Sequence, residues 1–265
     1  MFEIVLVCLL LGVLAGLVAG LLGVGGGIVI VPTLAILFQA QGFNESNIMH
    51  LALGTSLATI AVTSISSVVA HHRLGSFNWP LVWWLTPGLM LGAALGALLA
   101  DQVASITLQR LFGIFAMLVA GYMFWGAKVV SAKARVIATP ELMAIGTLIG
   151  GVSAILGIGG GTMTVPYLTW RGRAMREAVA VSSACGFPIA VAGSAGYLLA
   201  GLGASSLPPL ATGYLYWPAF LAICGTSLFM APVGARLAHK LPVKQLKWIF
   251  ALTLLVIGAV MVVKS

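Results

Sequence analysis

Charged residues are scarce in this 265-residue sequence, where they make up 7% of the chain against 61% for hydrophobic residues. Soluble domains carry about 25% charged residues, so a water-soluble enzyme is excluded and a membrane protein is indicated. Five Asp and Glu stand against thirteen Lys and Arg, for a net charge of +8. In a membrane protein such an excess reports the orientation of the loops rather than a nucleic-acid-binding surface.

Cysteines are also few. Cys8, Cys185 and Cys224 are far apart and lie in apolar runs, which excludes a disulfide framework and a thiolate metal site. We expect free thiols, no cofactor and no metal. Glu3 precedes the first apolar run where a signal peptide has basic residues, so we expect the N-terminus to belong to the mature fold.

The few carboxylates all lie at the ends of apolar segments: Glu3, Glu45, Asp101, Glu141 and Glu177. No carboxylate is therefore expected in the middle of the membrane, where it could relay protons or bind Na⁺. His50, near the outer end of its segment, is the remaining candidate for proton coupling.

Long apolar runs dominate the rest of the chain. They cover residues 4–22, 28–40, 48–70, 80–100, 108–127, 140–156, 162–170, 178–201, 218–238 and 246–263. A helix needs roughly 20 residues to cross the hydrocarbon, but the runs 28–40 and 162–170 are shorter, and each follows a glycine cluster. We predict that these two are half-helices.

The chain contains an internal repeat. A shift from residue 22 to residue 156 places the sequence LGVGGG on LGIGGG, and the same shift places Val31-Pro32 on Val165-Pro166. Such self-similarity indicates duplicated structural units. We predict an all-α polytopic membrane protein with two repeats, 1–127 and 140–265, joined by a cytoplasmic linker at 128–139. Each repeat would contain a glycine-broken helical hairpin and three transmembrane helices.

The basic residues indicate how the two repeats lie in the membrane. If each hairpin counts as an even number of crossings, the second repeat is inverted, and eleven basic residues fall on one side with Arg110 and Lys264 opposite. This obeys the positive-inside rule. If each hairpin were one kinked crossing, the repeats would be parallel and the bias would vanish. We predict an inverted-topology repeat with both termini outside.

Glycine clusters inside apolar runs, one in each inverted half, are typical of a transporter's binding site. The amides there would start two short helices, and helix N-termini attract anions through unpaired N–H groups and the helix dipole. The alternative is that the glycines only allow a tight turn and close packing. A nucleotide-binding loop is excluded, since no Lys-Ser or Lys-Thr follows either cluster. The predicted substrate-binding residues are Gly25, Gly26, Gly27, Ile28, Gly159, Gly160, Gly161 and Thr162.

Small polar residues open the third apolar segment of each half, where Gly54-Thr55-Ser56 aligns with Ser182-Ser183-Ala184. Hydroxyls can donate to oxyanions, although in membrane helices they also bond their own backbone or a neighbouring helix. Four hydroxyls are predicted to touch the substrate: Thr55, Ser56, Ser182 and Ser183.

A proline lies inside each half-helix, Pro32 in the first and Pro166 in the second. Each leaves a backbone carbonyl without a helical partner. We predict that both act as hinges, with a simple kink as the alternative.

The duplicated glycine motifs, the two Val-Pro pairs and the run Gly234-Ala235-Arg236-Leu237-Ala238 resemble the TauE/SafE family of sulfite exporters, also called the TSUP permeases. The resemblance covers essentially the whole chain. It implies transport of a sulfur-containing anion, such as sulfite, thiosulfate or an organosulfonate, across the bacterial inner membrane, usually outward. One departure is that the second copy has Thr162-Met163-Thr164 where the first has Ile28-Val29-Ile30, which makes the half-sites chemically unequal.

Together these observations predict an alternating-access exporter for such an anion, with membrane lipid as its surroundings and no nucleic-acid partner. A membrane potential that is negative inside drives an anion outward without a buried carboxylate. Two alternatives stay open: a passive anion channel, and a membrane enzyme acting on lipid phosphates, which should show Arg, carboxylates or a Ser/His pair beside the hairpins. The sequence carries no signal for an oligomeric state.

Overall fold

The protein is almost entirely helical. The computed structural model describes all residues except 1, 24, 74–77, 126–137, 239–242 and 264–265. Its elements are α1 (Phe2–Leu22), α2 (Gly27–Ala40), α3 (Ile48–Arg73), α4 (Trp79–Asp101), α5 (Ser105–Trp125), α6 (Thr139–Ile155), α7 (Gly161–Trp170), α8 (Met175–Ala200), η1 (Gly201–Gly203), β1 (Ala211–Thr212), β2 (Leu215–Tyr216), α9 (Trp217–Ala238) and α10 (Val243–Val263).

Each of the predicted apolar segments forms a helix whose ends lie within three residues of the predicted ones, so the all-α polytopic fold is confirmed. The loop between α8 and α9 contains a small addition that the sequence did not predict. There β1 and β2 pair antiparallel, with Ala211 opposite Tyr216, and the turn that joins them uses Gly213 at a φ of 53°.

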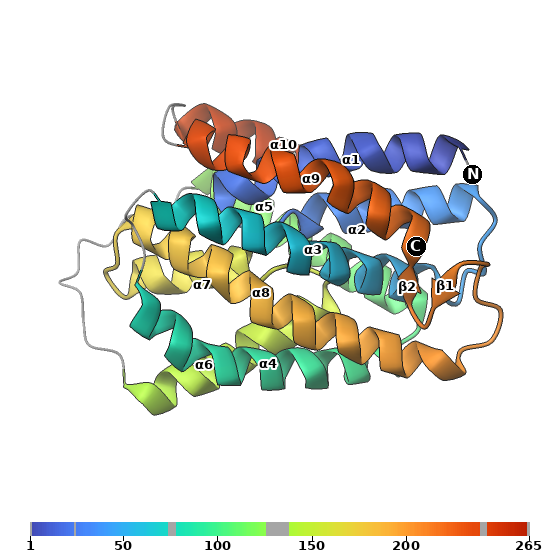
Figure 1. The fold of residues 1–265 in the computed structure, drawn as a ribbon, viewed down its shortest axis with the longest axis horizontal. Helices are drawn as coiled ribbons and strands as arrows, with labels where there is room; N and C mark the ends of the chain where they lie inside the picture. Colours follow the sequence, from blue (N-terminus) through green and yellow to red (C-terminus); the bar gives the residue numbers. More distant parts are fainter. Residues whose placement is uncertain (1, 24, 74–77, 126–137, 239–242, 264–265) are drawn as a thin grey trace.

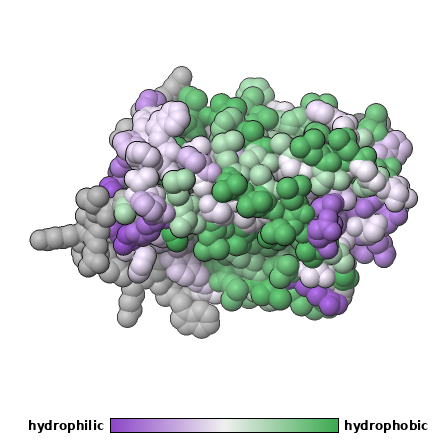
Figure 2. All heavy atoms as spheres, turned by 90° about the horizontal axis from the view of Figure 1, so that it is seen from below, coloured by the Kyte–Doolittle hydropathy of each residue, from purple (hydrophilic) through white to green (hydrophobic). Residues whose placement is uncertain are grey.

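Six helices are long and apolar enough to cross a membrane within the described residues: α1, α3, α4, α5, α8 and α9. Figure 2 shows a broad apolar surface between hydrophilic ends. An apolar band of this kind suits contact with the hydrocarbon of a bilayer. The chain is therefore a multi-pass membrane protein.

The first helix of each predicted repeat packs against the other repeat. α1 lies along α9, and α6 lies along α4. Glycines allow the backbones to approach closely: a Cβ on Gly16 would lie 2.7 Å from the carbonyl oxygen of Ser227, and one on Gly92 would lie 2.0 Å from that of Thr147. Close packing of small residues is the usual way in which membrane helices associate.

Matching helices of the two halves run in opposite directions in Figure 1, where α1 starts at the end marked N and α6 starts at the opposite end. The two chain termini lie at the same end of the molecule. The predicted linker at 128–139 falls mostly on residues 126–137, which lie outside the described residues. The division into two repeats and their inversion in the membrane stay predictions.

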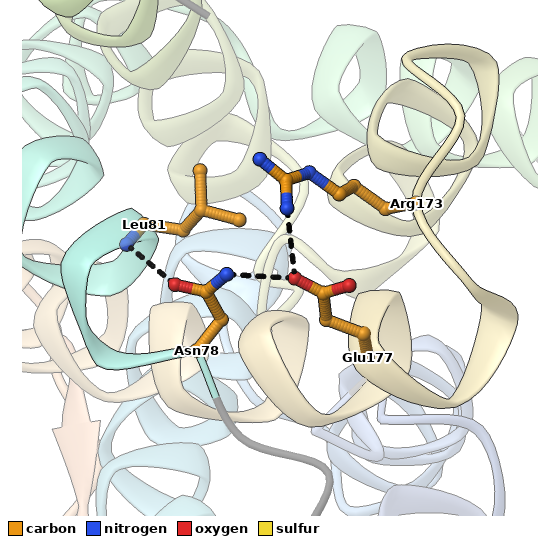
Figure 3. A network of polar contacts seen from close by, with 4 residues as sticks. All are labelled: Asn78, Leu81, Arg173 and Glu177. Carbon is orange, nitrogen blue, oxygen red and sulfur yellow. Dashed lines mark hydrogen bonds and ion pairs between the residues drawn. The ribbon is translucent and has the colours of Figure 1, made fainter. Parts of the chain in front are cut away.

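Polar contacts hold the helix ends opposite the termini (Figure 3). Asn78 caps α4 by accepting the N–H of Leu81, at 3.4 Å, and donates to the carboxylate of Glu177 in α8 at 2.8 Å. Arg173 donates to the same carboxylate oxygen at 3.3 Å. This network joins the start of α4 to the start of α8.

Candidate functional site

The two glycine loops share a left-handed backbone conformation at two matching positions, and they differ at a third, where Gly25 has a φ of 76° and Gly159 has no positive φ. Gly23 and Gly157 have φ values of 67° and 64°, while Gly26 and Gly160, the residues that cap α2 and α7, have 77° and 73°. L-residues rarely adopt this left-handed region, whereas glycine does so at little cost. The local fold therefore requires glycine at matching positions of both loops.

The loops meet each other inside the protein. A Cβ on Gly25 would lie 3.3 Å from the Cα of Gly159, and one on Gly27 would lie 2.4 Å from the carbonyl oxygen of Gly157. The structure therefore brings the two predicted glycine clusters together. Their role in substrate binding stays a prediction.

Each loop presents the N-terminus of a half-helix. The carbonyls of Gly26 and Gly160 accept hydrogen bonds from the residues three and four positions later. The N–H groups of Gly161 and Thr162 have no acceptor among the described residues, as expected for a first helical turn. No Lys, Arg, Asp or Glu is buried within the described part of the chain. Amides, hydroxyls and the helix dipoles could attract an anion to the loops without a buried Lys or Arg.

Two of the predicted hydroxyls hold the glycine loops in place. Ser56 of α3 donates to the carbonyl of Gly157 at 2.8 Å, and Ser182 of α8 donates to the carbonyl of Gly23 at 2.9 Å. Each serine thus binds the loop of the opposite half. Ser56 and Ser182 share this role, although the sequence alignment had paired Ser182 with Gly54, two residues away.

The other two predicted hydroxyls also bond the backbone. Thr55 accepts the N–H of Tyr216 at 3.0 Å, and Ser183 donates to the carbonyl of Val179 in its own helix at 3.0 Å. Both residues are buried. In the structure the Thr55 hydroxyl joins α3 to β2, and the Ser183 hydroxyl bonds a carbonyl of its own helix, α8. Contact of either residue with the substrate stays a prediction.

The prolines lie where the sequence predicted, inside the half-helices. Pro32 is buried in α2, and Pro166 is half-buried in α7. Each follows its capping glycine by six residues, so the carbonyls of Ile28 and Thr162 lose their usual helical N–H donors. The hinge role stays a prediction.

Sequence reasoning missed two buried hydroxyls beside the second loop, Ser153 in α6 and Thr164 in α7. Together with Thr162, their oxygens have no hydrogen-bond partner among the described residues. The sequence signal was the Thr-Met-Thr run itself, which replaces Ile-Val-Ile.

His50 lies away from these contacts, against the last turn of α4. Its Nε2 is 3.1 Å from the carbonyl oxygen of Ala100, and its ring stacks on Tyr214 at 4.9 Å. The Tyr214 hydroxyl donates to Asp101 at 3.0 Å. Burial, this hydrogen bond and the charge of Asp101 raise the pKa of Tyr214 to about 12.

The comparisons with known proteins agree with a multi-pass membrane protein. The sulfite exporter TauE/SafE family matches residues 8–261. A probable membrane transporter protein of Haemophilus influenzae is 39% identical over 269 residues, which cover all of both chains. A probable membrane transporter protein of Methanocaldococcus jannaschii is 27% identical over 98% of this chain and 97% of its own. No solved structure gives a significant match. The chain therefore belongs to the TauE/SafE family, a family of membrane transporters and not of enzymes.

Proposed function

We propose that the protein exports a small sulfur-containing anion, such as sulfite, thiosulfate or an organosulfonate, by alternating access. The observation that carries this proposal is the contact between the two glycine loops, each of which caps a half-helix. Discontinuous helices of this kind point their N-termini at anionic groups in other transporters. The sulfur chemistry rests on the family, whose name is sulfite exporter TauE/SafE.

The charges support export as the direction of transport. A membrane potential contributes about 2.3 kcal/mol per charge per 100 mV, which drives an anion out of a cell whose interior is negative. No carboxylate is buried within the described part of the chain, so export driven by the potential suits the composition of the core. Pro32 and Pro166 would provide the hinges.

The orientation in a bacterial inner membrane is part of the proposal. Four described arginines lie at or beyond the ends of α7, α8 and α9 opposite the chain termini: Arg171, Arg173, Arg176 and Arg236. Cytoplasmic loops carry the excess of Lys and Arg. This end would face the cytoplasm, and both termini would face the periplasm. The opposite directions of α1 and α6 support two inverted repeats.

The test is anion flux from proteoliposomes that contain the purified protein, under an imposed potential of either sign. Saturable flux of sulfite, thiosulfate or methanesulfonate that follows the potential is expected. Conductance far above carrier turnover would instead identify a channel, and no flux of any of the three anions from folded protein would refute the proposal. The matched variants are Gly160→Val, which should abolish flux, and Gly42→Val, which has a similar φ but no atom near its added Cβ and should keep it.

A second experiment tests the orientation. Single cysteines introduced into the 40–48 and 171–176 loops of a cysteine-free variant should react with an impermeant maleimide from opposite sides of the membrane. Labelling of both loops from the same side would contradict the inverted arrangement.

A further inference from the structure

The second half of the transporter has unpaired hydroxyls where the first half is apolar. Ser153 and Thr164 are fully buried, and their oxygens, like that of Thr162, have no partner among the described residues. An unpaired buried hydroxyl costs about as much as a lost hydrogen bond. The corresponding residues of the first half, at the repeat spacing, are apolar: Ala19, Ile28 and Ile30.

Thr164 differs from other helical threonines of the protein in the hydrogen bond that its hydroxyl makes. Thr33, Thr63 and Thr169 donate to the carbonyl four residues earlier, at distances of 2.7–2.9 Å. This local bond is the usual way for a helical threonine to satisfy its hydroxyl in an apolar setting. Thr164 does not make it, although the carbonyl of Gly160 lies four residues earlier. Its hydroxyl is therefore left for another acceptor.

The three hydroxyls belong to residues in or beside the first turn of α7. Thr162 and Thr164 belong to its first turn, and a Cβ on the capping residue Gly160 would lie 3.5 Å from the Ser153 oxygen. The N–H groups of Gly161 and Thr162 are free at the same place. At the other loop, a Cβ on Gly27 would instead meet Ile60 at 2.8 Å. The N–H groups of Gly27 and Ile28 are free at α2 in the same way, so the two half-helices differ, within the described residues, in the unpaired hydroxyls that only α7 has beside it.

We propose that the anion is bound by the α7 half alone, through the hydroxyls of Ser153, Thr162 and Thr164, and that the α2 half forms an apolar wall. This inference rests on the proposed transport function and deepens it. Each hydroxyl can donate one hydrogen bond to an oxygen of a sulfonate or hydrogen sulfite group.

The same donors select the charge of the ligand. The cost of moving an ion out of water rises with the square of its charge, and neutral donors at a helix N-terminus provide no full positive charge to offset it. Among the sulfur anions proposed above, the site should therefore prefer singly charged ones, such as an organosulfonate or hydrogen sulfite, to thiosulfate, and it should likewise disfavour sulfate, since both of these carry two charges.

The experiment measures binding of methanesulfonate and of sulfate to the purified protein by thermal stabilisation, together with the KM for methanesulfonate flux. Wild type should bind methanesulfonate at least tenfold more tightly than sulfate. Thr164→Val should weaken methanesulfonate binding about tenfold, as expected for one hydrogen bond to a charged group. Thr164→Ser should restore it, and Thr169→Val, in the same helix, should leave it unchanged.

A purely structural role gives a different result. Because the Thr164 hydroxyl is unpaired, Thr164→Val should then leave both binding and flux unchanged while it maintains or raises the unfolding temperature without ligand. If the valine variant does not fold, Ser153→Ala makes the same test with a smaller change. Wild-type affinity in folded Thr164→Val and Ser153→Ala, or equal binding of sulfate, overturns the proposal.

The result separates this inference from the proposed function. Wild-type protein that binds methanesulfonate through these hydroxyls but moves none of the three sulfur anions contradicts the transport function alone. Protein that transports methanesulfonate equally well with and without the hydroxyls contradicts the hydroxyl site alone.

Discussion

Replacing glycines of positive φ with alanine should distinguish two costs to stability: the strain of the backbone conformation and the steric clash of the new methyl group. Gly26, Gly42 and Gly160 have φ values of 77°, 70° and 73°. Alanine in the left-handed region costs roughly 1–2 kcal/mol relative to its normal conformation. This part of the penalty should be the same at the three positions, so any difference among them reports what the new methyl group meets.

The surroundings of the three positions differ sharply. A Cβ at Gly42 has no atom within 4 Å, while one at Gly26 would lie 2.6 Å from the carbonyl oxygen of Ala15 in α1. At Gly160 the obstacle is the terminal Cδ1 of Ile189, at 2.5 Å. Overpacking against rigid atoms costs about 1–3 kcal/mol. We therefore expect losses of about 1–2 kcal/mol for Gly42→Ala and about 2–5 kcal/mol for Gly26→Ala.

Gly160→Ala should fall between these values and should be partly rescued. Ile189→Val removes the Cδ1 that blocks the new methyl and by itself costs about 0.5–1.5 kcal/mol. The double variant should therefore be more stable than the sum of the two single changes predicts. Such a coupling is expected only between residues in contact.

The assay is the free energy of unfolding in mixed micelles, followed by the fluorescence of the seven tryptophans. Two results would refute the reasoning. Gly26→Ala could be no less stable than Gly42→Ala, which would mean that the backbone of α1 at Ala15 moves away from the new methyl group at little cost. Alternatively, Gly160→Ala and Ile189→Val could be additive, which would mean that the methyl does not meet Cδ1.

Three further changes test other contacts. Ser56→Ala should lower the free energy of unfolding by about 1–3 kcal/mol, because a buried loop carbonyl loses its donor, whereas Ser194→Ala, on the exposed side of α8, should have little effect in the same assay. Asn78→Ala should cost about 1 kcal/mol through the lost cap of α4, and an unchanged unfolding curve would contradict Figure 3. Tyr214→Phe should be pH-dependent: because the pKa of Tyr214 is raised from 10.0 to about 12, the extra stability of wild type over the variant is present below pH 10 and is lost as the pH rises to about 12. A constant difference measured between pH 8 and pH 12 would contradict the contact with Asp101.

Most of the fold could be predicted from the sequence because few alternatives exist for an apolar chain. In lipid the backbone must satisfy its own hydrogen bonds, so long apolar runs become helices. The starts of α2 and α7 were predictable because Gly26 and Gly160 interrupt those runs. The β1–β2 hairpin was missed, since two residues in each strand give no periodic pattern.

The site was predictable at the level of the backbone and less so for the side chains. The position of the glycine loops follows from their duplication. The partners of Ser56 and Ser182 depend on how α3 and α8 lie against the opposite loop, which no local pattern encodes. Likewise, the sequence shows that Thr164 has a hydroxyl, but it does not show that this hydroxyl makes no hydrogen bond to the carbonyl of Gly160, four residues earlier.

The packing of α1 along α9 has a consequence for the order in which the protein is made. The face of α1 that carries Gly12 rests against Ile223, which leaves the ribosome roughly 200 residues later, about 10–40 s at usual rates of synthesis. α6 finds α4 already in the bilayer when it emerges. α1 therefore enters the membrane before its permanent neighbour exists, and its glycine face borders lipid until the penultimate helix arrives.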